Sequence, residues 1–108
     1  MKKSIWLSYD LGVQGDYEGL YRWLDNEGAV ECGDSFAFLK IEIPDAKSVP
    51  QFLTEEIKAN VALGKTDRVY VIWFNATDKQ MKGRFIIGKR KGSPWEGFGD
   101  VAVTQDDL

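Results

Sequence analysis

The sequence predicts a single α+β domain in which an antiparallel sheet carries two helices on one face. Three observations support this prediction. The chain has 108 residues, 44% of them are hydrophobic, and β-rich segments alternate with two stretches of helical periodicity. A chain of this length supports one hydrophobic core. Its composition is that of an ordinary globular protein, which excludes disordered, collagenous and coiled-coil chains.

The first half of the chain predicts a strand, a helix and a hairpin. Residues 5–10 alternate in the way that is typical of a strand with two different faces. Asp16 is placed to cap a helix, which continues with apolar residues at helical spacing and ends at Gly28. Residues 29–31 and 35–43 then predict two strands joined by a turn.

The second half predicts a helix and two further strands. Ser48 begins a capping pattern, and Gly64 is the expected end of the helix that follows. The nearly continuous apolar run at residues 68–74 is typical of a central strand buried on both faces. We expect the strand aromatics Trp73, Phe74, Phe36 and Phe38 in the core. A polar loop at residues 75–82 leads to a last strand at residues 83–89.

This order of elements predicts a ferredoxin-like βαββαβ plan with one extra C-terminal strand. The expected domain covers residues 1–93, and an acidic tail covers residues 94–108, where Trp95 and Phe98 offer side chains that can pack on the body. Large residues on both faces of several strands indicate that a second subunit covers the free face of the sheet. We therefore expect a homodimer.

Charge is unevenly distributed along the chain. The net charge is −3, which by itself argues against a simple nucleic-acid-binding protein. Four of the seventeen acidic residues follow Pro94, however, where there is no base, so the remaining body carries one net positive charge. Six basic residues and no acid lie between positions 79 and 91, namely Lys79, Lys82, Arg84, Lys89, Arg90 and Lys91. These cations are candidate phosphate contacts, and protection of an edge strand is the structural alternative.

Two scarce residue types limit the chemistry. The chain has no histidine, which removes the commonest general base and most zinc sites. Its lone cysteine, Cys32, cannot form an internal disulfide, so we expect a reducing, cytoplasmic compartment. The apolar stretch near the start is broken at Ser8 and Asp10, and no run approaches the length of a membrane span, so no membrane association is expected.

Three short motifs resemble the CRISPR-associated protein 2 family and its relative, the virulence-associated protein D (VapD) toxin family. They are Tyr9-Asp10-Leu11 at the end of the first strand, the helix end at residues 24–28, and Ser35-Phe36-Ala37-Phe38. The resemblance covers roughly residues 4–90. It implies a dimer in which a carboxylate from each first strand, here Asp10, faces its counterpart across the two-fold axis.

Members of that group act as magnesium-dependent nucleases or hold duplex DNA, so the resemblance implies a catalytic and metal-binding role for Asp10. Mg²⁺ commonly uses one or two carboxylates together with a substrate phosphate. Ser8 shares the strand face of Asp10 and is expected to orient water or phosphate. Arg22 is the one base in the first helix and a further candidate phosphate contact. The alternative role for Asp10 is a turn or capping residue.

Two functions therefore remain open from the sequence. The first is a small homodimer that handles RNA or duplex DNA, with weak Mg²⁺-dependent endoribonuclease activity through Asp10. The second is a non-catalytic dimeric module that binds a protein partner. The tryptophans Trp6, Trp23 and Trp95 and the tail residue Phe98 are less clearly internal, and base stacking is open for them.

Overall fold

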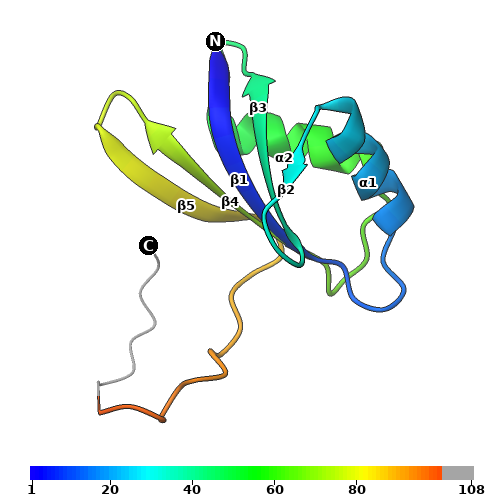
Figure 1. Ribbon diagram of the computed structural model, residues 1–108, viewed down its shortest axis with the longest axis vertical. Coiled ribbons are helices and arrows are strands. Elements are labelled where there is room, and N and C mark those ends of the chain that lie inside the picture. Colours follow the sequence, from blue (N-terminus) through cyan, green and yellow to red (C-terminus); the bar gives the residue numbers. More distant parts are fainter. Residues whose placement is uncertain (101–108) are drawn as a thin grey trace.

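The computed structural model describes residues 1–100, and its regular elements lie between Lys2 and Ile87 (Figure 1). Strands and helices follow in the predicted order. They are β1 (Lys2–Asp10), α1 (Tyr17–Asn26), β2 (Val30–Glu31), β3 (Phe36–Glu42), α2 (Val49–Asn60), β4 (Arg68–Asn75) and β5 (Gln80–Ile87). The fold is therefore the expected mixed α+β type.

The five strands form one antiparallel sheet in the order β2-β3-β1-β4-β5. This arrangement is consistent with a ferredoxin-like class. The short strand β2 and the last strand β5 form the two edges, and β1 lies at the centre between β3 and β4. Figure 1 shows α1 near the β2 edge, on the opposite side of the molecule from β5.

The hydrophobic core lies between the sheet and the two helices. Alternate residues of the three central strands point into it, beginning with Ile5 and Leu7 of β1, both 0% exposed. Leu20 of α1 and Leu53 of α2 belong to the same buried cluster. Since one cluster contains side chains from both helices, both helices cover the same face of the sheet, as predicted.

The opposite face of the sheet is not covered by any segment between residues 1 and 100. Tyr70 and Ile72 of β4 are only half-buried, and Phe74 is 48% exposed. The prediction that residues 68–74 are buried on both faces is therefore wrong for the single chain. Phe74 and the half-buried Phe36 and Phe38 are not core residues either. Of the aromatic residues in β4, Trp73 alone lies in the core, at 8% exposure.

Several predicted boundaries differ from the structure. Strand β1 begins at Lys2 rather than at residue 5. Helix α2 ends at Asn60 rather than at Gly64, because Val61 already has extended backbone angles. Gly64 lies in the following loop, where its N–H donates to Asp67 Oδ2 over 2.7 Å. Strand β5 begins at Gln80 and ends at Ile87, so it starts three residues before the predicted 83 and stops two before 89. Its first residues pair with the end of β4, which shortens the expected polar loop.

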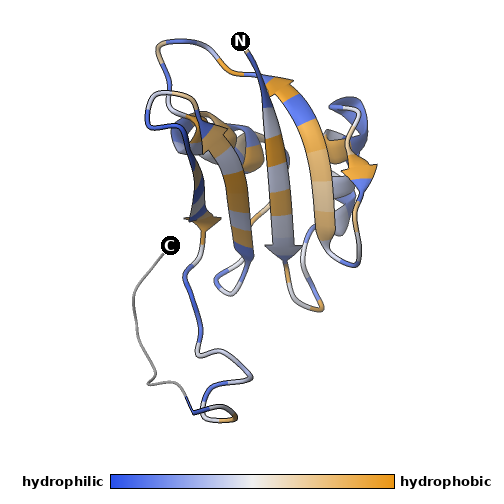
Figure 2. Cartoon of the chain, turned by 60° about the vertical axis from the view of Figure 1, so that its left-hand side comes forward, coloured by the Kyte–Doolittle hydropathy of each residue, from blue (hydrophilic) through white to orange (hydrophobic). Residues whose placement is uncertain are grey.

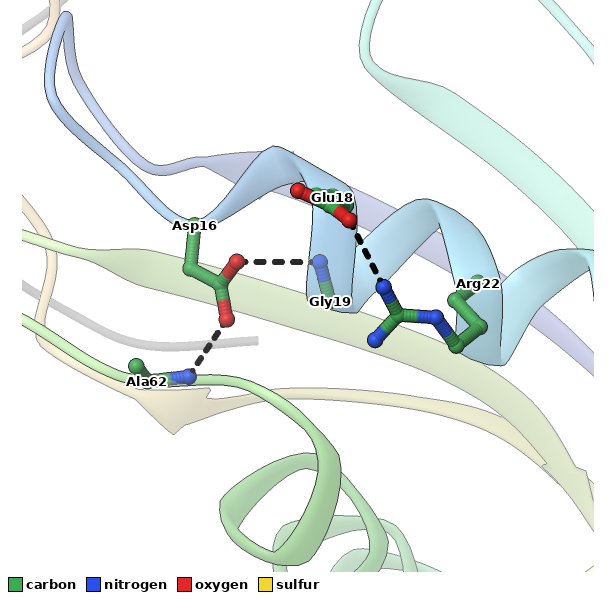
Figure 3. Close-up of polar contacts among 5 residues, drawn as sticks. All are labelled: Asp16, Glu18, Gly19, Arg22 and Ala62. Carbon is green, nitrogen blue, oxygen red and sulfur yellow. Dashed lines mark hydrogen bonds and ion pairs between the residues drawn. The ribbon is translucent and has the colours of Figure 1, made fainter.

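Both predicted helix caps are confirmed. The Ser48 hydroxyl accepts a hydrogen bond from the Gln51 N–H (3.2 Å) at the start of α2. The Asp16 carboxylate accepts from the Gly19 N–H (2.9 Å) and, through its second oxygen, from the Ala62 N–H (2.8 Å), as Figure 3 shows. These hydrogen bonds, with that from Ala62 the larger effect, hold the pKa of Asp16 below its usual value. Asp16 therefore joins the start of α1 to the chain after α2.

Gly19 is required where α1 approaches the end of α2. A Cβ atom at this position would lie 2.4 Å from Asp16 Oδ2 and 2.7 Å from the backbone oxygen of Asn60. We expect Gly19→Ala to lower the free energy of unfolding by about 2 kcal/mol, because the cost of overpacking exceeds the helix-propensity gain of alanine. Urea unfolding followed by circular dichroism measures this change.

Gly64→Ala is the matched control for that prediction. The nearest atoms to a Cβ at position 64 are 3.7 Å away, which is ordinary van der Waals contact. We expect the control to change the unfolding free energy by less than about 0.5 kcal/mol. Equal stability of the Gly19→Ala and Gly64→Ala proteins would contradict the close contact between the two helices.

The described part of the tail does not pack on the body through its aromatic residues. Trp95 is 73% exposed and Phe98 is 88% exposed, so the expected docking of these two side chains is not seen. Asp106 and Asp107 lie outside the described residues. Within residues 1–100, no helix is both long and apolar enough to cross a membrane.

Candidate nucleic-acid interface

The open face of the sheet carries a ladder of aromatic side chains. Residues paired across antiparallel strands share a face, so the register places Trp6 beside Phe38 and Ile72 in one row. A second row, closer to the end of β1, contains Phe36, Ser8, Tyr70 and Phe85. The rings make contact within each row: the Trp6 and Phe38 centroids are 4.9 Å apart, and those of Tyr70 and Phe85 are 4.8 Å apart. We call these five aromatic residues and Ile72 the aromatic face.

Two arginines lie over the second row of rings. The guanidinium carbon of Arg90 is 5.4 Å from the Phe85 ring centre and 5.8 Å from that of Tyr70. The guanidinium carbon of Arg68 is 5.7 Å from the Phe85 ring centre. These distances are within the range of cation–π interactions. The aromatic face therefore has positive charge at one end.

A close approach between β4 and β5 fixes the position of Tyr70. A Cβ atom on Gly83 would lie 2.4 Å from the Tyr70 hydroxyl oxygen, so the glycine gives the tyrosine its space. The Tyr70 hydroxyl and Arg68 Nε are buried and have no hydrogen-bond partner within residues 1–100. Buried polar atoms usually have partners. The chain therefore leaves unsatisfied hydrogen-bonding groups at this end of the aromatic face.

The predicted residues Asp10 and Ser8 lie together in a small hollow at this same end. The hollow, which we call the Asp10 hollow, has a volume of about 250 Å³ and is lined by Ser8, Tyr9, Asp10, Arg68, Tyr70, Phe85 and Arg90. Asp10 is the register partner of Arg68, and its Oδ2 lies 3.4 Å from an Arg68 terminal nitrogen. Its Oδ1 accepts a hydrogen bond from the Gly12 N–H over 3.2 Å. Asp10 thus has the turn contact that the alternative interpretation expects, and an ion pair as well.

The electrostatics of the Asp10 hollow favour an ionised Asp10 carboxylate. The Gly12 N–H, and after it the Arg68 guanidinium, hold the pKa of Asp10 below its usual value. Burial, with a hydrogen bond that the Tyr9 hydroxyl donates to Tyr21, raises the pKa of Tyr9 to about 12, so its hydroxyl stays protonated at neutral pH. The Tyr9 ring packs against Tyr17 and Tyr21 of α1. At neutral pH the hollow therefore offers a carboxylate that only accepts hydrogen bonds.

The surroundings of Asp10 do not by themselves fit a divalent cation. A guanidinium already contacts the carboxylate, and such a cation repels a metal ion. Within residues 1–100, no group of three or more cysteine, aspartate or glutamate residues is arranged to hold a metal ion. The predicted Mg²⁺ site at Asp10 would need ligands from another molecule.

Five of the six residues in the predicted basic run line a second, larger groove. This groove, of about 1,080 Å³, follows β5 and the segment after it, and contains Lys82, Arg84, Lys89, Arg90 and Lys91. In Figure 2, β5 and the chain after it are mostly blue, whereas β3 is mostly orange. Asp78 and Glu96 are the acids that line the groove, and Asp78 pairs with Lys82 over 3.1 Å. We call this the basic groove.

Arg90, Tyr70 and Phe85 connect the basic groove with the Asp10 hollow, since all three line both of them. The basic groove therefore meets the aromatic face at these three residues. Lys82 and Arg84 stand on the helix side of β5, because their register partners Trp73 and Val71 are core residues. Strands β1, β3, β4 and β5 contribute the residues of these two surfaces.

Two of the predicted cations lie away from these surfaces. Arg22 is on α1, where its guanidinium pairs with Glu18 over 2.8 Å. Lys79 occupies the β4–β5 turn with a positive φ of 56° and does not line the groove. Among the candidate stacking residues, Trp6 lies on the aromatic face, whereas Trp23 is 3% exposed and belongs to the core.

Sequence reasoning missed Arg68, Tyr70 and Phe85 as site residues. A signal for Arg68 was present. In an antiparallel pair the first residue of one strand lies opposite the last residue of the other, so Arg68 and Asp10 are natural partners. No comparable signal identified Tyr70 and Phe85, because strand aromatics are also common in cores.

Comparisons of this chain with protein-family models, curated proteins and solved structures found no match.

Proposed function

We propose that this protein binds single-stranded nucleic acid across the open side of its sheet. Bases stack on the aromatic face, and phosphates lie along the basic groove. The observation that carries this proposal is that the basic groove, which passes round the β5 edge, meets the aromatic face at Arg90, Tyr70 and Phe85. A single strand needs both parts together, because it presents rings and phosphates side by side.

The aromatic face suits bases that are not paired. Trp6, Phe36 and Phe38 stand on the two central strands and are only half-buried, so their rings are accessible. Flat rings on an antiparallel sheet are a known way of holding two or three unstacked bases. Bases inside a duplex are already stacked and cannot lie on such a surface. The geometry therefore favours single strands over the duplex.

The distribution of charge supports the same proposal. Lys82, Arg84, Lys89, Arg90 and Lys91 all line the basic groove. Acidic residues such as Glu18 and Asp25 belong to α1, which Figure 1 shows on the far side of the molecule from β5. The net charge of −3 therefore does not describe the surface that a nucleic acid would meet.

The same geometry favours binding over hydrolysis. Asp10 is paired with Arg68, and no second carboxylate lines the Asp10 hollow. A Mg²⁺-dependent nuclease would need the nucleic acid or a second chain to complete its metal site. Cleavage of RNA with Mg²⁺ that Asp10→Asn abolishes would show that the chain is an enzyme after all.

Fluorescence anisotropy with labelled oligonucleotides tests the proposal. We expect single-stranded RNA or DNA of about ten nucleotides to bind with a log–log salt slope of about −3, since four or five phosphates contact the groove. A duplex of the same length should bind at least tenfold more weakly. Binding that is equal for single strand and duplex, or insensitive to salt, would overturn the proposal.

A second copy of the chain is the competing occupant of the open face. Phe74 and Met81, 48% and 56% exposed, extend the apolar surface beyond the aromatic rows, and β5 is an edge strand. The homodimer predicted from the sequence would use this surface. Sedimentation velocity with and without the oligonucleotide separates the two: a dimer through the open face would dissociate when the strand binds or would prevent binding.

A further inference from the structure

The Asp10 hollow pairs an acceptor with a donor at the edge of the aromatic face. The Asp10 carboxylate contributes two oxygens, and the Arg68 guanidinium lies beside it, with 3.4 Å between Oδ2 and the nearest terminal nitrogen. Oδ1 accepts one hydrogen bond from the Gly12 N–H, and Oδ2 accepts one from Arg68. Each oxygen can therefore accept another hydrogen bond. The hollow can therefore form hydrogen bonds with donors and acceptors on the edge of a planar ligand.

We propose that the Asp10 hollow selects a guanine base in the bound strand, with Asp10 and Arg68 as the specificity residues. This inference rests on the proposed single-strand binding. The two carboxylate oxygens accept from the N1–H and the N2 amino group of guanine, and the Arg68 guanidinium donates to O6. Both side chains thereby recognise adjacent groups on one edge of the base.

The order of donors and acceptors separates guanine from the other bases. Guanine presents two neighbouring donors followed by an acceptor, which complements a carboxylate next to a guanidinium. Adenine presents one donor to Asp10 and loses one of the two hydrogen bonds. Uracil has a single donor between two carbonyl acceptors, so one carbonyl would face a carboxylate that cannot donate.

Cytosine is the closest competitor, and the exposure of the two side chains decides against it. Cytosine has one donor and two acceptors, so it would need two donors from Arg68 and one acceptor from Asp10. The Asp10 side chain is 53% exposed, whereas that of Arg68 is 26% exposed. Asp10, which supplies two acceptor oxygens, is therefore the more accessible of the two side chains. This favours guanine, the base with two donors.

The walls of the hollow suit a purine ring. Tyr70 and Phe85 form one wall, and the planar Arg90 guanidinium lies over both rings. Aromatic rings and arginine planes are the surfaces on which unpaired bases stack. Ser8 adds a hydroxyl that can donate to or accept from the sugar or base edge.

Binding of four RNA pentanucleotides of the form U-U-X-U-U tests the inference, with X as each of the four bases. We expect the guanine oligonucleotide to bind about tenfold more tightly than the other three, in keeping with one well-placed bidentate contact. Asp10→Asn should remove this preference, because the amide replaces one acceptor by a donor. Asp25→Asn, which removes one negative charge from α1, is the matched control and should keep the preference.

The outcomes distinguish this inference from the proposed function. Binding of all four oligonucleotides with equal affinity, or with cytosine or adenine preferred, overturns the guanine site and leaves single-strand binding intact. A guanine preference that persists in Asp10→Asn also overturns it. Failure of every oligonucleotide to bind the folded wild-type protein would remove the proposed function itself.

Discussion

Replacing three cations of the basic groove by glutamine should weaken single-strand binding on the order of a hundredfold at about 50 mM salt. The variant carries Arg84→Gln, Lys89→Gln and Lys91→Gln. All three side chains are exposed and line the groove. Arg90 is left in place because it also covers the Tyr70 and Phe85 rings. The change therefore removes charge without removing the contacts over the aromatic face.

The size of this effect follows from counterion release. Each phosphate that a single strand no longer places against a cation reduces the log–log salt slope by about 0.7, so the triple variant loses about 2. Wild type and variant should converge near 1 M salt, where release of counterions contributes little, and diverge as salt is lowered. Anisotropy titrations at four or five salt concentrations measure both slopes.

A second triple variant provides the control for net charge. Arg22→Gln, Lys58→Gln and Lys65→Gln also remove three cations, but none of these residues lines the basic groove or the Asp10 hollow. We expect a small loss of affinity and an unchanged slope. If both triple variants weaken binding equally, net charge rather than the groove determines the affinity. Such a result would also restore Arg22 to the set of phosphate contacts.

Local patterns predicted most of the fold because they depend on neighbours in sequence. Alternation in β1 and β3 separated the two faces of each strand correctly, and Asp16 and Ser48 marked both helix starts. The start of β5 was missed for a physical reason. Gln80 and Met81 are exposed on an edge strand, where polar and apolar residues are both tolerated, and their pairing with Asn75 and Phe74 depends on the hairpin.

The site was less predictable because it depends on register between distant strands. Asp10 and Arg68 are 58 residues apart and meet only through the pairing of β1 with β4. From the sequence, Asp10 was a candidate metal ligand only through the family resemblance. Beside a guanidinium, the same carboxylate is one half of an ion pair, and its chemistry is that of a hydrogen-bond acceptor.

The free face of the sheet was anticipated from the sequence, but its character was not. Large residues at both strand positions indicated a surface that needs a partner. Residues such as Phe38 and Tyr70 have the same strand propensity on either face, so periodicity cannot say which aromatic residues belong to the core. Only the position of the two helices settles this, and it leaves Trp6, Phe36 and Phe38 on the open side.

Removing the rings of Trp6 and Phe38 should weaken single-strand binding on the order of thirtyfold, or about 2 kcal/mol, since base stacking contributes about 1–3 kcal/mol per base. The double variant Trp6→Leu and Phe38→Leu keeps apolar side chains on neighbouring strands, where the two rings are 4.9 Å apart. In contrast to the loss of cations, this loss should be the same at every salt concentration, because stacking releases no counterions. Anisotropy across the same salt series measures it.

The matched control replaces two aromatic residues on the helical side, Tyr21→Leu on α1 and Phe52→Leu on α2. We expect its affinity to equal that of the wild type. A loss in the aromatic-face variant that grows as salt falls would mean that the variant weakens phosphate contacts rather than base stacking. If the Trp6→Leu and Phe38→Leu variant loses the same affinity at every salt concentration and the control does not, bases lie on the sheet. Phosphate contacts alone cannot produce a loss of affinity that is independent of salt.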